Sequence, residues 1–109
     1  MKIEFDKMDE TRIPEFKGGK GELIAKMRVD ELGKIMYGKL PVGSSIGYHK
    51  HDGNSEIIYI LDGVAKCLYD DGEEELVKGD CHYCPKGHSH SLINVGDDEL
   101  VFFAVVPEQ

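Results

Sequence analysis

A chain of 109 residues can bury one modest hydrophobic core, so the sequence predicts a single domain over residues 1–109. Thirteen basic and 21 acidic residues give a formal charge of −8, which repels phosphate backbones and anionic membrane surfaces. We therefore expect neither a nucleic acid nor a membrane as a partner. The N-terminal stretch MKIEFDKMDETRIPEF lacks the apolar core of a signal peptide, which predicts a cytoplasmic protein.

The spacing of apolar residues predicts an all-β fold. Helical periodicity is a candidate only within about the first fifteen residues, where Pro14 interrupts it, so residues 1–20 are expected to form an N-terminal arm. Beyond the arm, short β-rich runs alternate with Asp- and Gly-containing turns, which favours antiparallel hairpins in a sandwich or barrel. In chain order the expected strands are residues 21–29, 34–40, 56–61, 64–69, 73–77, 80–84, 90–95 and 99–106.

Two of these segments carry expectations about the surface. The apolar run LVFFAVV at residues 100–106 is too short to cross a membrane, and it would aggregate if it were exposed. We expect it to lie between two sheets or in a subunit interface, which favours a homodimer. The acidic triplet Glu73–Glu75 is expected to form a solvated strand face.

Residues 47–56, GYHKHDGNSE, are a candidate metal-binding segment. If the backbone is extended, His49 and His51 project from the same face of a strand. Glu56 begins the apolar strand EIIYIL on the face of Ile58 and Ile60, where an ionised carboxylate needs a cation or an arginine as a partner. Histidine and carboxylate together are the usual ligands of iron, manganese, nickel, cobalt and zinc. A polar surface loop is the alternative interpretation of this segment alone.

A second segment, GDCHYCPKGHSHSLIN at residues 79–94, again places a polar residue at the head of an apolar strand. Pro85 fixes its own φ and Gly87 tolerates positive φ, which suits a turn that sends the next strand back across the sheet. His90 begins that strand, and Leu92 shares its face.

Together the two segments resemble the paired motifs of the cupin family. Residues 43–63 match GxxxxxHxHxxxxExxxxxxG and residues 79–94 match GxxxxxPxGxxHxxxN at every fixed position. The resemblance implies a double-stranded β-helix, which is a jelly-roll barrel of antiparallel strands, over residues 21–109. It also implies one divalent transition metal, which we expect to be iron, manganese, nickel or zinc. The ligands implied are His49, His51, Glu56 and His90. An organic ligand among unmetallated histidines is the alternative.

Three further polar residues near the second motif have competing interpretations. His88 is the candidate catalytic residue, as a base near the metal, although an exposed histidine is common in such a turn. His82 has the parity to point inward, and a satisfied or exposed histidine is the alternative. Asn94 matches the motif and is expected to hydrogen-bond backbone near the mouth of the barrel.

The cysteines are expected to be structural. An odd count of three gives no disulfide framework. Cys81 and Cys84 form a CxxC, but residues three apart on a strand point to opposite faces, which disfavours a shared metal or a redox pair. With Cys67, they are interpreted as small buried apolar residues.

The reaction does not follow from these residues, because proteins that resemble this one include oxygenases, isomerases, epimerases, decarboxylases and binding modules. The first hypothesis is a metalloenzyme, a dioxygenase or a sugar isomerase or epimerase, acting on a small oxygen-rich metabolite that chelates the metal. The alternative is a non-catalytic module that binds a metal or a metabolite. Either way, the expected partner is a small molecule.

Overall fold

Ten β-strands dominate the fold, which confirms the all-β prediction, and the computed structural model describes every residue from 1 to 109. The strands are β1 (Thr11–Pro14), β2 (Glu22–Asp30), β3 (Gly33–Leu40), β4 (Ser45–Lys50), β5 (Glu56–Asp62), β6 (Val64–Tyr69), β7 (Gly72–Val77), β8 (Cys81–Cys84), β9 (Ser89–Asn94) and β10 (Leu100–Pro107). Two short 3-10 helices, η1 (Phe5–Lys7) and η2 (Phe16–Gly18), flank β1. No helix has the length and apolar character needed to cross a membrane.

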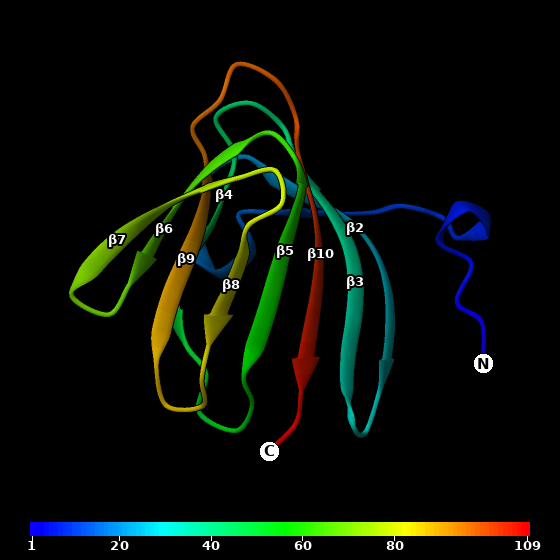
Figure 1. Ribbon diagram of the computed structural model, residues 1–109. Helices are drawn as coiled ribbons and strands as arrows, with labels where there is room; N and C mark the ends of the chain where they lie inside the picture. The colour runs from blue at the N-terminus through cyan, green and yellow to red at the C-terminus, as the bar shows by residue number, and fades with distance from the viewer.

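The strands form two antiparallel sheets that enclose the core between them (Figure 1). The larger sheet has the order β1-β2-β3-β10-β5-β8, and the smaller sheet has the order β4-β9-β6-β7. From β3 onwards the chain crosses repeatedly from one sheet to the other, and only the β6–β7 hairpin stays within one sheet. This path is the double-stranded β-helix that the sequence motifs imply.

All eight expected strands are present, each within one residue of its predicted ends. Two further strands were not among them. β4 carries the first histidine of the site, and β1 lies inside the segment that was expected to be an arm. Because Thr11 pairs with Ala25 and Pro14 with Glu22, part of residues 1–20 belongs to the larger sheet. Pro14 is tolerated because β1 is an edge strand and ends there.

The core is filled by alternate residues of the strands. On β5, Ile58 and Ile60 point inward while Ile57 and Tyr59 point outward, as the period of two requires. Glu56 lies at the start of the inward face of β5, so its carboxylate is drawn between the sheets. The buried apolar cluster consists of Leu23, Ala25, Met36, Leu40, Ile46, Ile58, Ile60, Ala65, Cys67, Leu76, Leu92, Leu100, Phe102 and Ala104.

β10 lies in the middle of the larger sheet, paired with β3 on one side and β5 on the other. Its backbone is therefore hydrogen-bonded along both edges, and Phe102 on its inner face is fully buried. On its outer face Phe103 is half-buried and meets the ring of Phe5 from η1, with centroids 6.3 Å apart. The apolar run thus lies between two sheets on one face, as predicted, and its other face remains partly open.

Candidate metal centre

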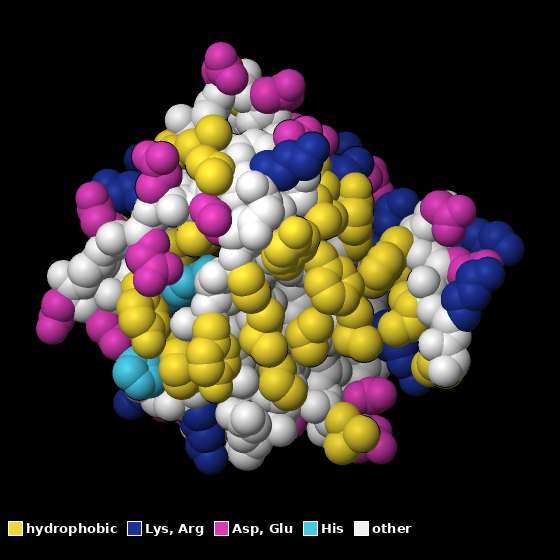
Figure 2. All heavy atoms as spheres, viewed as in Figure 1, with side chains coloured by type: hydrophobic (Ala, Val, Ile, Leu, Met, Phe, Trp, Pro, Cys, Tyr) yellow, Lys and Arg dark blue, Asp and Glu magenta, His cyan; other side chains and the backbone are white.

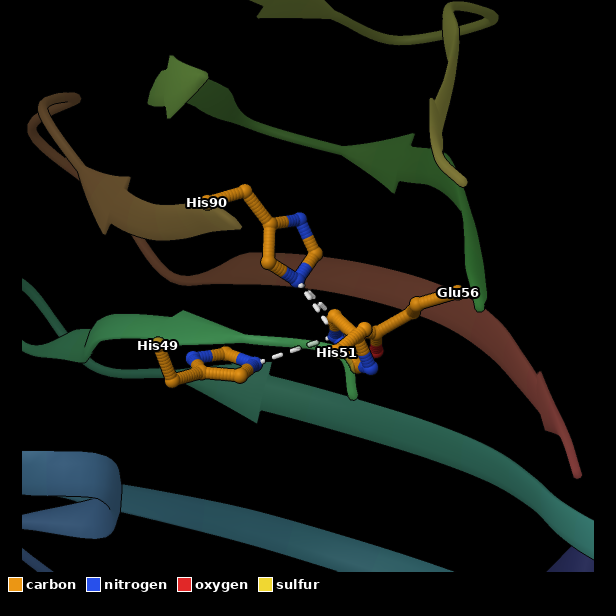
Figure 3. Close-up of side chains that lie close together, drawn as sticks. All are labelled: His49, His51, Glu56 and His90. Carbon is orange, nitrogen blue, oxygen red and sulfur yellow. Dashed lines mark hydrogen bonds and ion pairs between the residues drawn. The ribbon is translucent and has the colours of Figure 1, made fainter. Parts of the chain in front are cut away.

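Four side chains from three strands and one loop converge between the two sheets (Figure 3). His49 lies on β4, His51 follows β4 directly, His90 lies on β9, and Glu56 opens β5. The Nε2 atom of His51 is 3.2 Å from Nε2 of His49 and 2.9 Å from Nε2 of His90. Glu56 Oε1 is 2.9 Å from Nε2 of His90 and 3.2 Å from Nε2 of His51. The structure therefore brings together the four side chains that the motifs predict to be metal ligands.

A β-bulge in β4 turns His49 toward the other ligands. Ile46 pairs with Leu92 on β9, but the register then shifts, and His49 pairs with His90. The extra residue in β4 reverses the inside–outside alternation beyond Ile46, so His49 faces the site while Tyr48 is 52% exposed. Without the bulge, a tyrosine would occupy the position of the histidine.

The outer nitrogen of each ligand histidine has its own acceptor. Nδ1 of His49 donates to the carbonyl of Gly47, at 2.7 Å, and Nδ1 of His51 donates to the side-chain oxygen of Asn54. Nδ1 of His90 lies 3.0 Å from Nε2 of His82. With a proton on each Nδ1, the three Nε2 lone pairs and the carboxylate point at one another. Such a set of acceptors fits a cation.

The electrostatics of the site also suit a cation. Burial by itself would raise the pKa of the Glu56 carboxyl. When His51 and His90 carry a proton on Nε2 they donate hydrogen bonds to this carboxylate, which outweigh the effect of burial and lower the pKa of Glu56 to about 2. Burial lowers the pKa of His49 and so favours its neutral form, whereas the hydrogen bond to Glu56 raises the pKa of His51. At neutral pH Glu56 is ionised and His49 is neutral, which are the forms that ligate metals.

A cavity of about 270 Å³ adjoins the ligands. Its lining includes three lysines beside the ligands, in a chain whose formal charge is −8. The lining residues are Phe16, Lys17, Lys34, Met36, Ile46, His49, Lys50, His51, Asp52, Gly53, Asn54, Glu56 and Val106. Three imidazoles and one carboxylate would leave coordination positions of a six-coordinate ion free, and these positions would face the cavity.

A family model described as a cupin domain matches residues 36–106. The chain belongs to the cupin family. An oxalate-binding protein of Thermotoga maritima is 37% identical to this cupin over 113 residues, which cover 97% of this chain and 93% of that protein. A solved structure from Thermotoga maritima, described as a predicted oxalate decarboxylase, has a TM-score of 0.93 and 32% identity, with 100% of both chains covered. KdgF from Halomonas sp. shares the fold, with a TM-score of 0.80 and 17% identity over 100% of this chain and 96% of its own.

His88, the predicted catalytic residue of this cupin, does not join the four ligands and does not line the cavity. Its Nδ1 lies 2.6 Å from Oδ2 of Asp70, and its ring stacks on Tyr69. The side chain of His88 is 44% exposed. Its backbone carbonyl does contribute, because it accepts a hydrogen bond from the backbone N–H of His51 at 3.0 Å. The turn of the second motif thus holds a candidate ligand of the first in place.

His82 and Asn94 of the cupin are buried and have polar partners. His82 points inward, as its parity allows, and lies against His90. Asn94 donates from Nδ2 to the carbonyls of Leu40 and Asp98, which confirms its predicted role in binding backbone.

The cysteines of the cupin follow the predicted parity, with one correction. Cys84 is buried and Cys81 is exposed, so the two sulfurs lie on opposite faces of β8. The interpretation of all three as buried residues is therefore wrong for Cys81. Burial raises the pKa of the Cys67 thiol to about 12 and that of the Cys84 thiol to about 11, which keeps both as neutral thiols.

Several other residues around the site were not predicted from the sequence. Phe16 and Lys17 line the cavity because η2 packs across β4. The two backbones are so close there that a Cβ atom on Gly47 would lie 2.0 Å from the carbonyl oxygen of Lys17. Asn54 could have been recognised, since it lies in the turn between the histidines and Glu56. Glu74 was expected on a solvated face, but its carboxylate turns inward to His82.

Proposed function

We propose that this cupin binds one divalent transition metal through His49, His51, Glu56 and His90, and that the metal holds a small oxygen-rich dianion in the adjoining cavity. Oxalate is the first candidate for that dianion. The observation that carries the proposal is the convergence of three Nε2 lone pairs and an ionised carboxylate next to a cavity lined by lysines. A bound metal would supply positive charge and open coordination positions there.

The lysines support an anionic ligand. The Nζ atoms of Lys17 and Lys34 lie 5.6 and 5.8 Å from the centroid of the Phe16 ring, and neither lysine takes part in an ion pair with a carboxylate. The third lysine, Lys50, is 3.5 Å from Asp52. Two unpaired ammonium groups and a divalent metal favour a dianion over a neutral sugar.

The size of the cavity and the relatives support oxalate. A cavity of about 270 Å³ accommodates only a small ligand. Oxalate is a two-carbon dicarboxylate that chelates a metal through one oxygen of each carboxylate. The relative at 37% identity is named for binding it.

Binding of the dianion, rather than its conversion, is the activity that the cavity supports best. Acid–base catalysis needs a proton donor or acceptor beside the ligand, other than the metal ligands. His88 and His82 do not line the cavity, and its other ionisable groups are lysines and Asp52, whose side chain is 82% exposed. The proposed function is therefore metal-dependent binding of oxalate. Conversion of oxalate to products is tested separately.

Calorimetric titration tests the proposal on protein purified without a metal-affinity tag. We expect Mn(II) to bind with a stoichiometry of one, and oxalate to bind the Mn(II)-loaded protein but not the metal-free protein. The double variant Lys17→Met/Lys34→Met should bind oxalate about 10-fold more weakly, which corresponds to roughly 1.4 kcal/mol. Lys86→Met, in an exposed turn, is the matched control. Equal oxalate affinity with and without Mn(II) would contradict the proposal, and release of formate or CO₂ would add catalysis to it.

We also propose that the cupin forms a homodimer through the outer face of the larger sheet. Figure 2 shows apolar side chains gathered over this face, seen from the side of β5, β10 and β3. Ile57, Tyr59 and Tyr83 are 38%, 43% and 54% exposed there. Val105 pairs with Ile57, and Ile57 pairs with Tyr83, so Val105, Ile57 and Tyr83 form a continuous row across β10, β5 and β8. Contiguous apolar surface of this kind is typical of a protein interface.

Light scattering after size-exclusion chromatography tests the dimer. Tyr59→Glu places a charge in the centre of the apolar face and should give a monomer. Tyr48→Glu is the matched control, because Tyr48 is a tyrosine of similar exposure on the smaller sheet. A monomeric wild type, or an unchanged mass for Tyr59→Glu, would contradict this interface.

A further inference from the structure

A second cluster of polar side chains lies on the far side of His90 from the cavity. It consists of Cys67 on β6, Glu74 on β7 and His82 on β8. Nε2 of His82 is 3.0 Å from Nδ1 of His90 and 3.3 Å from the sulfur of Cys67. Nδ1 of His82 is 2.8 Å from Oε1 of Glu74. The proposed function uses none of these three residues.

The positions of the protons in this cluster follow from the metal site. If Nε2 of His90 binds a metal, its lone pair must be free, so its proton is on Nδ1. Nδ1–H of His90 then donates to Nε2 of His82, which must carry a lone pair. The proton of His82 is therefore on Nδ1, where it donates to the carboxylate of Glu74. The position of the proton on His90 thus determines the position of the proton on His82.

The hydrogen bonds of this cluster run from a buried side chain to an exposed one. The side chain of His82 is 1% exposed, whereas that of Glu74 is 47% exposed, so the hydrogen bonds lead from the buried ligand to a carboxylate in contact with water. The rings of His82 and His90 are nearly parallel, at 22°. Burial keeps the Cys67 sulfur a neutral thiol, whose hydrogen has the carbonyl of Leu68 as another acceptor at 3.5 Å.

The sequence of β7 explains how Glu74 reaches His82. Side chains alternate along a strand, so Glu74 faces inward with the buried Leu76, while Glu73 and Glu75 face away. Glu73 forms an ion pair with Lys66 at 3.0 Å on the outer face. Within the acidic triplet only the middle carboxylate is placed to receive the proton of His82.

We propose that His82 and Glu74 are positioning residues for the metal ligand His90. They hold its proton on Nδ1, orient the ring so that Nε2 faces the other ligands, and raise the electron density that Nε2 offers. This inference rests on the proposed binding of a metal by His90. Loss of such an outer partner typically weakens metal binding by about 10–100-fold.

Two replacements of His82 separate this role from simple packing. In His82→Gln the side-chain amide lies near the position of Nε2, so its oxygen can accept the proton of His90. In His82→Asn the shorter amide lies near the position of Nδ1, so it can bond Glu74 but leaves Nδ1–H of His90 without an acceptor. We expect His82→Gln to bind Mn(II) within about threefold of the wild type, and His82→Asn to bind it about 10–100-fold more weakly.

Variants on β7 test the exposed end of the His90–His82–Glu74 hydrogen bonds without replacing a buried imidazole. Glu74→Ala removes the acceptor of His82 and should weaken Mn(II) binding, while Glu75→Ala on the opposite face is the matched control and should leave it unchanged. The same variants are loaded with Zn(II) for NMR of ¹⁵N-labelled histidine. The wild type should show a protected Nδ1–H proton on His90, and His82→Asn should lose it to exchange with water.

The outcomes separate this inference from the function on which it rests. If the wild type does not bind Mn(II), the proposed function and this inference both fall. If the wild type binds Mn(II) but His82→Asn and Glu74→Ala bind it equally well, the inference alone is overturned. A stoichiometry of two metals, reduced to one by Cys67→Ser, would also overturn it, because the cluster would then be a second metal site.

Discussion

Gly38 on β3 lies directly opposite Phe102 on β10, and its missing side chain makes room for the phenyl ring. A Cβ atom at position 38 would lie 2.4 Å from Cζ of Phe102, 2.8 Å from Cε2 and 2.9 Å from Cε1. Phe102 is 0% exposed, so its ring cannot move out into solvent. We expect Gly38→Ala to reduce the free energy of unfolding by about 1–3 kcal/mol through overpacking. At an unhindered strand position the same change would stabilise by roughly 0.5–1 kcal/mol.

A double-mutant cycle tests whether the ring is the cause. Phe102→Leu alone leaves a cavity and should reduce the free energy of unfolding by about 1–3 kcal/mol. In that background the new methyl group occupies space that the ring has vacated, so Gly38→Ala should be neutral or stabilising. The predicted interaction energy between the two positions is therefore about 2 kcal/mol.

Urea unfolding followed by circular dichroism measures these values, since the chain has no tryptophan for fluorescence. Gly72→Ala is the matched control, because Gly72 also lies on a strand but a Cβ there would meet only one atom, at 3.8 Å, so this change should stabilise by up to about 1 kcal/mol. Additivity of Gly38→Ala and Phe102→Leu within about 0.5 kcal/mol would refute the steric argument.

Three further predictions follow from the site and the core. The hydrogen bond to Glu56 raises the pKa of His51, so below that pKa a metal must displace a proton from His51. The apparent affinity for Mn(II), measured by calorimetry, should therefore fall about tenfold per pH unit below that pKa and be constant above it. A flat profile from pH 5.5 to 8.5 would contradict this. Cys81 is the exposed thiol, so one of three thiols should react rapidly with a disulfide reagent at pH 8 in the native protein, and Cys81→Ser should abolish that phase. Asn94→Ala strands two backbone carbonyls and should reduce the free energy of unfolding by about 2–3 kcal/mol in urea, with Mn(II) binding retained if the role of Asn94 is structural.

Most of the fold could be predicted because its strands are short runs rich in β-branched, aromatic and other apolar residues, separated by turns that contain Asp and Gly. β1 and β4 could not be predicted for two different reasons. β1 is four residues long, ends in a proline and has no fully buried side chain, so it lacks an alternating signal. In β4 the bulge beyond Ile46 breaks the period of two, and only Ile46 of its six residues is buried.

The convergence of the four candidate ligands was predictable because the motifs fix their spacing along the chain, whereas the residues around them depend on contacts between distant strands. His82 could be assigned an inward parity, but its partners come from β7 and β9, and the sequence does not give the packing of those strands. The lysines that line the cavity were even less predictable. Lys17 reaches the site because two glycines, Gly19 and Gly47, let η2 and β4 approach each other backbone to backbone. No local pattern encodes that approach.

The central place of β10 in the larger sheet has a consequence for the order in which the molecule is assembled. β3 and β5 do not pair with each other, and only β10, which is synthesised after both, joins them. The β4–β9 pair, in contrast, needs no residue beyond 94, and it already carries two of the histidines. Closure of the larger sheet therefore depends on the C-terminal strand, whereas the smaller sheet is complete without it. Pairings between segments so distant along the chain form slowly, so we expect the larger sheet to close after the smaller one when the protein folds.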